Sequence, residues 1–237
     1  MGTEERLAAA GVGPGDDVVV PSYAPSSIAE AVRALGAQPV FADIDPAGYC
    51  LDPASAAGAM TLRTAAVVAV HLFGHPADLT ALRLVAATHG ALLVEHTDSV
   101  DTADLMALTR TEAETSRRQA NAAYLTSRLT GVLTPVVAPG VVHRYDSYVV
   151  RVPGNGRPDR DAFARALRAR GVWCRVPVRT PVHRMSPFRR ELWLPETERA
   201  VGECLELPVD AELTRRDLQR LVSACNALGG LVPLAAA

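Results

Sequence analysis

The residues best suited to chemistry follow one another after the apolar run ALLV: Glu95, His96, Thr97, Asp98 and Ser99. An imidazole titrates near pH ~6.5, so it can accept and donate protons in neutral solution, and a nearby carboxylate can orient it. This pattern predicts an acid–base centre in which His96 carries the proton and Asp98 or Glu95 orients its ring. The same polar groups could instead cap the end of a strand, which is the structural alternative.

Other polar side chains could line the same site. The predicted substrate-binding residues are His71, His75, Ser99, Tyr23, Arg175 and His183. His71 and His75 bracket the turn HLFGH, and Tyr23 lies in the stretch PSYAP. Arg175 could hold a carboxylate or a phosphate, because a guanidinium offers a planar fork of donors.

Metal and Schiff-base chemistry have little support in the sequence. His71, His75, His96 and Asp98 are residue types that bind zinc, but no predicted helix carries two histidines four residues apart, and the four cysteines form no C-x-x-C pair. All 24 residues counted as Lys or Arg are arginines. A Schiff base needs an amine that can lose its proton, and no side chain of this chain supplies one. We therefore expect neither a metal nor a cofactor held as a Schiff base.

The first half of the chain must form the elements that position these residues. Apolar runs without alternation, typical of strands buried on both faces, occupy residues 18–21, 39–44, 65–73 and 91–96. Helical patterns occupy residues 26–36, a stretch from residue 52, and 76–90. This alternation predicts a parallel sheet covered by helices, and ligands of such sheets bind beyond the carboxyl ends of the strands.

The second half is predicted to contain a long helix and a smaller α/β unit. The helical pattern of residues 101–131 has as its expected core contacts Leu105, Leu108, Ala120, Ala123, Tyr124 and Leu129. Strands are predicted at 145–152, 172–178 and 205–209, and helices at 159–171 and 213–230. The predicted organisation is a first domain at 1–100, a connecting helix at 101–134 and a small C-terminal α/β domain at 135–237.

Composition excludes several classes of protein. The 237 residues are 49% hydrophobic and 21% charged, with a formal net charge of -2, and no Arg-rich run is interleaved with aromatic residues. This argues against a nucleic-acid partner. No apolar stretch approaches the roughly 20 residues that span a bilayer, and the first residues lack the pattern of a signal peptide. We therefore expect no membrane partner and a cytoplasmic location.

Several ordered motifs resemble one known family. They are GVGPGDDVVVPSYAP, LGAQPVFADIDP, VHLFGHPADLTAL and THGALLVE, followed by DSYVVRVP, ALRARGVWCRVPVRTPVH and CLELPV. In this order they resemble sugar aminotransferases of the DegT/DnrJ/StrS type, fold-type I enzymes that use pyridoxal phosphate. The resemblance implies a truncated fold-type I aminotransferase-like parallel sheet, with residues 1–100 as a reduced large domain, and a small C-terminal α/β domain.

The departures from that family fall on its cofactor site. Where the family has an Asp that pairs with the cofactor's ring nitrogen, this chain has His96, and Ser99 stands where the family has Gln or His. Pro25 replaces the aromatic residue that stacks on the ring. The family's phosphate-binding Gly-Thr or Gly-Ser is expected before GVGPGD and is missing. The long segment with the anchoring lysine, expected after Val100, is missing too. The resemblance thus implies a family member without pyridoxal phosphate.

Three functions are compatible with this combination. The first is a cofactor-independent acid–base enzyme of secondary-metabolite biosynthesis, which would catalyse cyclisation, dehydration or isomerisation of a small-molecule biosynthetic intermediate. The alternative is a non-catalytic partner subunit of a full-length aminotransferase, and the third is a remnant without activity. Loss of part of the large domain would leave apolar surface uncovered, so we also expect a homodimer or a hetero-complex with an aminotransferase homologue.

Overall fold

The computed structural model describes residues 2–96, 105–153 and 160–228, which form two compact units. Unit 1 contains residues 1–100 and 178–199, and unit 2 contains residues 101–177 and 200–237. Within the part of the chain that is described, no helix is both long and apolar enough to cross a membrane.

Unit 1 is built around a four-stranded parallel sheet. Its elements are α1 (Thr3–Ala9), β1 (Asp17–Pro21), α2 (Ser26–Ala34), β2 (Gln38–Ala42), α3 (Pro53–Ala59), β3 (Thr64–Val70), η1 (Leu72–Gly74), α4 (Leu79–Thr88), β4 (Leu92–His96), η2 (Val182–Arg184), η3 (Ser186–Phe188) and the start of α7 (Pro195–Glu203). The strand order is β2-β1-β3-β4, and every neighbouring pair is parallel. The predicted parallel α/β fold is therefore confirmed.

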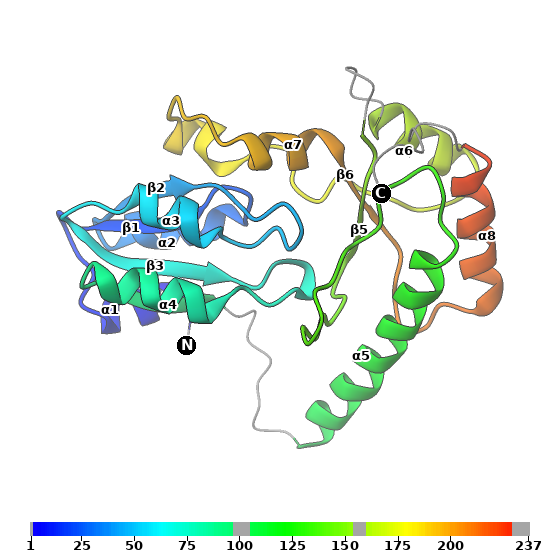
Figure 1. Cartoon of the computed structure of the whole chain (residues 1–237), viewed down its shortest axis with the longest axis horizontal. Helices are drawn as coiled ribbons and strands as arrows, with labels where there is room; N and C mark the ends of the chain where they lie inside the picture. The colour runs from blue at the N-terminus through cyan, green and yellow to red at the C-terminus, as the bar shows by residue number, and fades with distance from the viewer. Residues whose placement is uncertain (1, 97–104, 154–159, 229–237) are drawn as a thin grey trace. The chain divides into compact units, whose positions relative to one another are not determined.

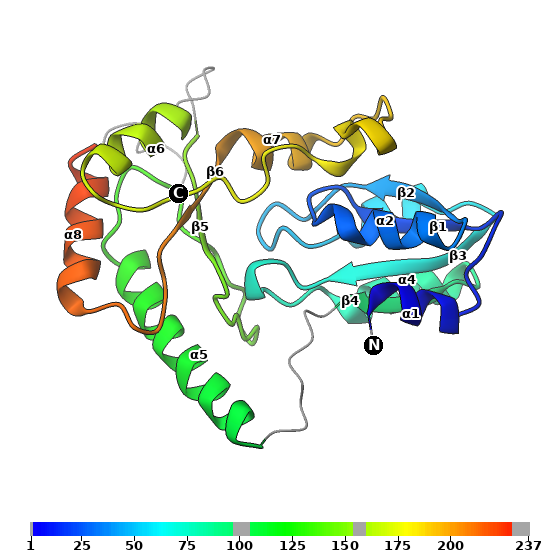
Figure 2. The same cartoon turned by 180° about the vertical axis from the view of Figure 1, so that it is seen from behind.

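Helices cover both faces of this sheet. Helices α3 and α4 pack together in front of the strands in Figure 1, whereas α1 and α2 pack together on the face seen in Figure 2. All five residues of β1 are buried, and β3 is buried at all but one position. This two-sided burial explains why these strands are apolar without alternation.

Unit 2 contains a two-stranded antiparallel sheet and three helices in its described residues. Its elements are α5 (Leu105–Thr126), β5 (Tyr148–Arg151), α6 (Arg160–Ala169), β6 (Cys204–Leu207) and α8 (Arg215–Asn226). The predicted strand at 172–178 is reduced to a single bridge between Arg175 and Glu206. Pro177 lacks a backbone N–H and cannot continue the ladder. From residue 111 onward, where its side chains are described, α5 buries Ala122 and Leu125 and exposes Ala120 and Ala123, so these two predicted core contacts are wrong. Tyr124 and Leu129 do pack in the core, and the side chains of Leu105 and Leu108 lie outside the described residues.

Candidate functional site

His71 and Glu95 face one another at the carboxyl ends of β3 and β4. His71 directly follows β3, and Glu95 is paired in register with Ala69 of that strand. The His71 Nε2 atom lies 3.8 Å from Glu95 Oε2, and the two side chains are 25% and 37% exposed. The parallel neighbours thus present an imidazole and a carboxylate together, both open to solvent.

One backbone hydrogen bond determines how this pair can react. The backbone N–H of Ala77 donates to His71 Nδ1 over 3.0 Å. The neutral ring therefore carries its proton on Nε2, the nitrogen that faces Glu95. A distance of 3.8 Å is too long for a hydrogen bond, so His71 can donate to a ligand while Glu95 accepts from it. The guanidinium of Arg83 lies 4.0 Å from the other Glu95 oxygen.

His96 occupies a different environment from Glu95. Its Nδ1 lies 2.5 Å from the Thr3 hydroxyl of α1, and Arg6 of the same helix donates to the Glu95 backbone carbonyl over 2.6 Å. Consecutive strand residues point to opposite faces, so the Glu95 carboxylate approaches His71 and does not orient His96. The other predicted members of this centre, Asp98 and Ser99, lie outside the described residues.

Tyr23 and His75 are packed near other strand ends. Tyr23 is fully buried, with its ring centroid 6.1 Å from that of Tyr49 and 6.2 Å from that of Phe73. Tyr49 and Phe73 both have a positive φ, which is uncommon for aromatic residues and often marks a constrained site. His75 Nδ1 bonds the Pro76 carbonyl over 2.9 Å. Sequence reasoning missed Tyr49, which follows the turn at 46–48, and Phe73, which lies within η1.

His183 belongs to a buried network in unit 1. Its side chain is 1% exposed, its Nδ1 lies 2.7 Å from the Ser22 hydroxyl, and its Nε2 lies 3.3 Å from Glu198. Burial lowers the pKa of His183 and opposes the neighbouring Glu198 carboxylate, which raises it. The predicted substrate-binding role would require this network to open. Sequence reasoning missed Ser22 and Glu198, which no local motif connects with His183.

Arg175 lies in unit 2 and is already paired. Its Nε and Nη2 atoms contact the two Glu206 oxygens at 2.6 and 3.0 Å. This bidentate hydrogen bonding raises the pKa of the guanidinium. A substrate anion would have to compete with Glu206 for the same fork of donors.

Comparison with known proteins connects this geometry with one family. The sequence of this chain matches the family model of the DegT/DnrJ/EryC1/StrS aminotransferase family over residues 2–104 and 102–226. The chain belongs to this family. The two matched segments meet at residues 102–104, shortly after β4.

Individual relatives agree with this assignment. A pleiotropic regulatory protein of Geobacillus stearothermophilus is 26% identical over 299 residues, covering 91% of this chain and 79% of the relative. The L-glutamine:scyllo-inosose aminotransferase of Streptomyces griseus is 48% identical over 89 residues, 38% of this chain but only 21% of the relative. The structure of S. venezuelae DesV in complex with a ketimine intermediate has a TM-score of 0.85 at 25% identity, covering 95% of this chain and 81% of DesV. The 299 aligned positions exceed the 237 residues of the chain, so the first relative has additional residues within the matched region.

The residues of this chain do not fit a covalently held pyridoxal phosphate. None of the 237 residues is a lysine, so no side chain can form a Schiff base with the cofactor. The residue after Glu95, where the family resemblance implies an aspartate, is a histidine whose Nδ1 contacts Thr3. An imidazole there lacks the fixed negative charge that would stabilise a pyridinium.

Proposed function

We propose that this chain is a family member that catalyses proton transfer on a small polyhydroxylated ketone without pyridoxal phosphate. The observation that carries the proposal is the His71–Glu95 pair, in which a proton donor and an acceptor lie 3.8 Å apart at open strand ends. The ketone class is inferred from the Streptomyces griseus relative, which is named for scyllo-inosose, a cyclic polyhydroxylated ketone.

The pair suits the formation of an enol from such a ketone. Glu95 would remove the proton from the carbon beside the carbonyl group, and the electron pair of that C–H bond would form a C=C bond. The carbonyl oxygen would receive the hydrogen bond, and then the proton, of His71 Nε2. Return of the protons gives the original ketone or an isomer and restores both side chains. A carboxylate base opposite a neutral histidine is an established arrangement for this chemistry.

His96 remains a second proposed proton carrier. It follows Glu95 on the other face of β4, and its ring is oriented by Thr3. Because the two imidazoles lie on opposite faces of the strand, variants of each residue separate their contributions.

Hydrogen exchange at carbon tests this function without knowledge of the natural product. We expect the chain to accelerate loss of the 1H NMR signals beside the carbonyl group of scyllo-inosose in D2O. Glu95→Gln should remove most of the acceleration, whereas His89→Ala, a change of the exposed histidine that directly follows α4, should not. Exchange no faster than in buffer alone would contradict the proposal.

Reaction with pyridoxal phosphate tests the cofactor part separately. After treatment with borohydride, we expect mass spectrometry to find an adduct only on the N-terminal amine, because no lysine amine is present. A reduced adduct on any side chain, or transamination with glutamine, would show that this part is wrong.

A second candidate is a non-catalytic partner subunit of a full-length aminotransferase. It is favoured by Leu84 of α4 and Leu92 of β4, which are 70% and 51% exposed on two elements that pack together. Exposed apolar side chains on adjacent elements are typical of an interface. Light scattering should show an oligomer, or a complex with an added full-length homologue, that Leu84→Glu disrupts. A monomer unaffected by the homologue would exclude this candidate.

A further inference from the structure

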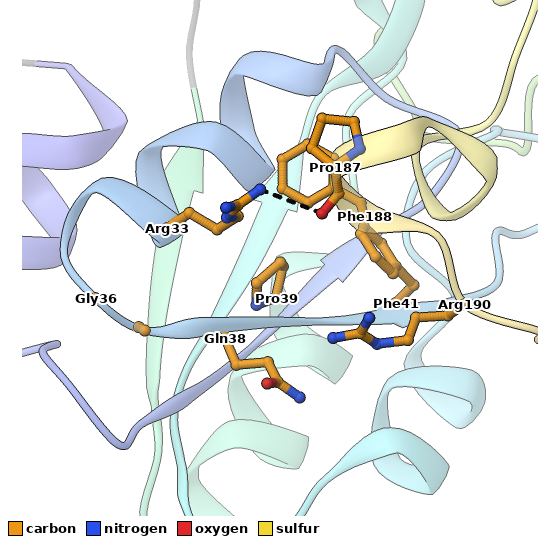
Figure 3. A pocket seen from close by; sticks show the side chains of 9 residues that line it. Arg33, Gly36, Gln38, Pro39, Phe41, Pro187, Phe188 and Arg190 are labelled. Atoms are coloured by element: carbon orange, nitrogen blue, oxygen red, sulfur yellow. Dashed lines mark hydrogen bonds between the residues drawn. The ribbon is translucent and has the colours of Figure 1, made fainter.

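A cavity of about 280 Å³ lies at β2, the edge of the described sheet opposite to β4 (Figure 3). Its walls come from the end of α2, from β2 and from the segment around η3, all within unit 1. It is separate from the His71–Glu95 pair, which lies at the other end of the strand order.

The polar lining of this cavity is cationic. Arg33 and Arg190 extend into it from opposite sides in Figure 3, and Gln38 adds an amide. No carboxylate is among its lining residues. Neither guanidinium makes an ion pair with any carboxylate in the described ranges of the chain, although the whole sequence has a net charge of -2. The two positive charges are therefore left for a ligand or for solvent.

Arg33 is held in place before any ligand arrives. Its Nη1 donates to the Pro187 carbonyl over 3.2 Å, and its guanidinium carbon lies 5.3 Å from the centre of the Phe188 ring. Phe188 is 4% exposed and packs edge-on against Phe41. A guanidinium has five N–H donors, so one bond to Pro187 leaves most of them for an anion.

Arg190 is also positioned by its backbone. Its N–H donates to the His183 carbonyl over 2.9 Å, and its Nη1 donates to the Arg189 carbonyl over 3.2 Å. Most of its guanidinium donors also remain for an anion. A neighbouring groove of about 590 Å³ shares Arg190 and is also lined by Arg184, Arg189 and Glu191. Arg184 is already paired with Glu198, and the Glu191 carboxylate would repel an anion. The smaller cavity is therefore the better anion site.

We propose that this cavity binds a small organic phosphate, namely the phosphate ester of a sugar or a cyclitol. Two guanidiniums and an amide supply the charge and the donors that a phosphate group requires. The exposed Pro187 offers an apolar contact for the carbon skeleton of the ester, and Phe41 and Phe188, which are 5% and 4% exposed, complete the lining. A volume of about 280 Å³ lies just below the range of roughly 300–1,000 Å³ that holds drug-sized ligands, so a nucleotide sugar would not fit inside.

Calorimetry with glucose 6-phosphate, citrate and glucose tests this site. We expect glucose 6-phosphate to bind and glucose not to bind. Arg33→Gln and Arg190→Gln should each weaken binding at least about tenfold, the effect of losing one charge-assisted hydrogen bond. Gln38→Glu should also weaken it, because the variant places a carboxylate beside the phosphate.

Arg170→Gln is the matched control, because it removes one positive charge from an exposed position of unit 2. It should leave the affinity unchanged. The proposal is overturned if glucose 6-phosphate gives no heat at millimolar concentrations, if citrate binds and glucose 6-phosphate does not, or if the control weakens binding as much as Arg33→Gln. Because the cavity is separate from the His71–Glu95 pair, its variants should retain any hydrogen exchange on scyllo-inosose.

Discussion

Unit 1 contains two histidine–glutamate pairs that differ in their access to solvent. The side chains of His71 and Glu95 are 25% and 37% exposed, whereas those of His183 and Glu198 are 1% and 19% exposed. In both pairs a glutamate carboxylate faces the Nε2 atom of the histidine. The residue types and the atoms in contact therefore do not distinguish the two pairs.

The surroundings of the two rings do distinguish them. The Ser22 hydroxyl lies beside His183 Nδ1, and the same Glu198 oxygen, Oε1, lies 3.3 Å from His183 Nε2 and 2.8 Å from Arg184 Nε. Both ring nitrogens of His183 therefore lie beside polar groups inside the buried region. His71 uses only Nδ1, for the Ala77 N–H, and its Nε2 can meet a ligand. The candidate site is therefore distinguished by a histidine N–H that a ligand can reach. A carboxylate close to the ring is not enough, because both pairs have one.

The largest expected effect concerns the open pair. Glu95→Gln keeps the shape of the side chain but removes the base, so the rate of hydrogen exchange on scyllo-inosose should fall by about 10²–10⁴-fold. Urea unfolding should be unchanged, because Glu95 is more than a third exposed. The measurement is 1H NMR in D2O for both proteins at equal concentration. A rate within about threefold of the unchanged protein would remove Glu95 from the mechanism.

The closed pair should respond to substitution with a loss of stability. His183→Ala leaves the Ser22 hydroxyl and the Glu198 carboxylate without their ring partner, so we expect about 2–4 kcal/mol less free energy of unfolding. His71→Ala leaves only the Ala77 N–H without its partner and should cost less, about 1 kcal/mol. Urea unfolding followed by circular dichroism measures both. If His71→Ala proved the more destabilising variant, the distinction between the two pairs would fail.

Asp43 should have a smaller effect on the same closed region. Its two oxygens accept the backbone N–H groups of Glu196 and Thr197, at 2.9 and 2.7 Å, and so cap the start of α7. Asp43→Ala should cost about 1–2 kcal/mol, and Asp43→Asn less, because an amide oxygen can still accept one of these bonds. The same urea experiment applies. Equal losses for the two variants would show that the charge matters more than the hydrogen bonds.

Local patterns predicted the sheet but not the closed region. The four parallel strands could be read from continuous apolar runs, because burial on both faces leaves no alternation. The contact between Ser22 and His183 joins residues 161 positions apart, and no local pattern encodes such a separation. The part of the fold that depends on residues 178–199 therefore required the structure.

The sequence named candidate site residues but not their pairing, and the roles of these residues stay predictions. His71, Glu95 and His96 were all identified because they end two strands. The two-residue period of a strand already implied that Glu95 and His96 point to opposite faces. Glu95 meets His71 because β3 and β4 are neighbouring strands and Ala69 is paired with Glu95. The sequence does not specify this pairing. In α5, the buried Ala122 and Leu125 show that a helical face can be misplaced when many residues are small or amphipathic.

The smallest expected effect is a pH dependence of stability that comes from His183 in the closed pair. Burial lowers the pKa of His183 below its ordinary value of about 6.5, despite the opposing Glu198 and Asp43 carboxylates and together with the nearby Arg184 guanidinium. The unfolded chain therefore binds a proton at a higher pH than the folded chain does. Above pH ~7 the ring of His183 is neutral in both states and has no effect on the pH dependence of stability. As the pH falls below ~6.5, protonation of His183 in the unfolded chain should lower the free energy of unfolding, by at most about 1.4 kcal/mol per pH unit.

Urea midpoints at pH ~7.5 and ~5.5 isolate this effect, because exposed aspartates and glutamates titrate near pH ~4, below that window. His183→Gln removes the titrating ring and should flatten the dependence, although it also lowers the stability at both pH values. His71→Gln should leave the dependence as it is, because His71 is not part of the buried network around His183. If His183→Gln kept the full dependence and His71→Gln lost it, the pH-sensitive histidine would be the open one. The assignment of structural and chemical roles to the two pairs would then be reversed.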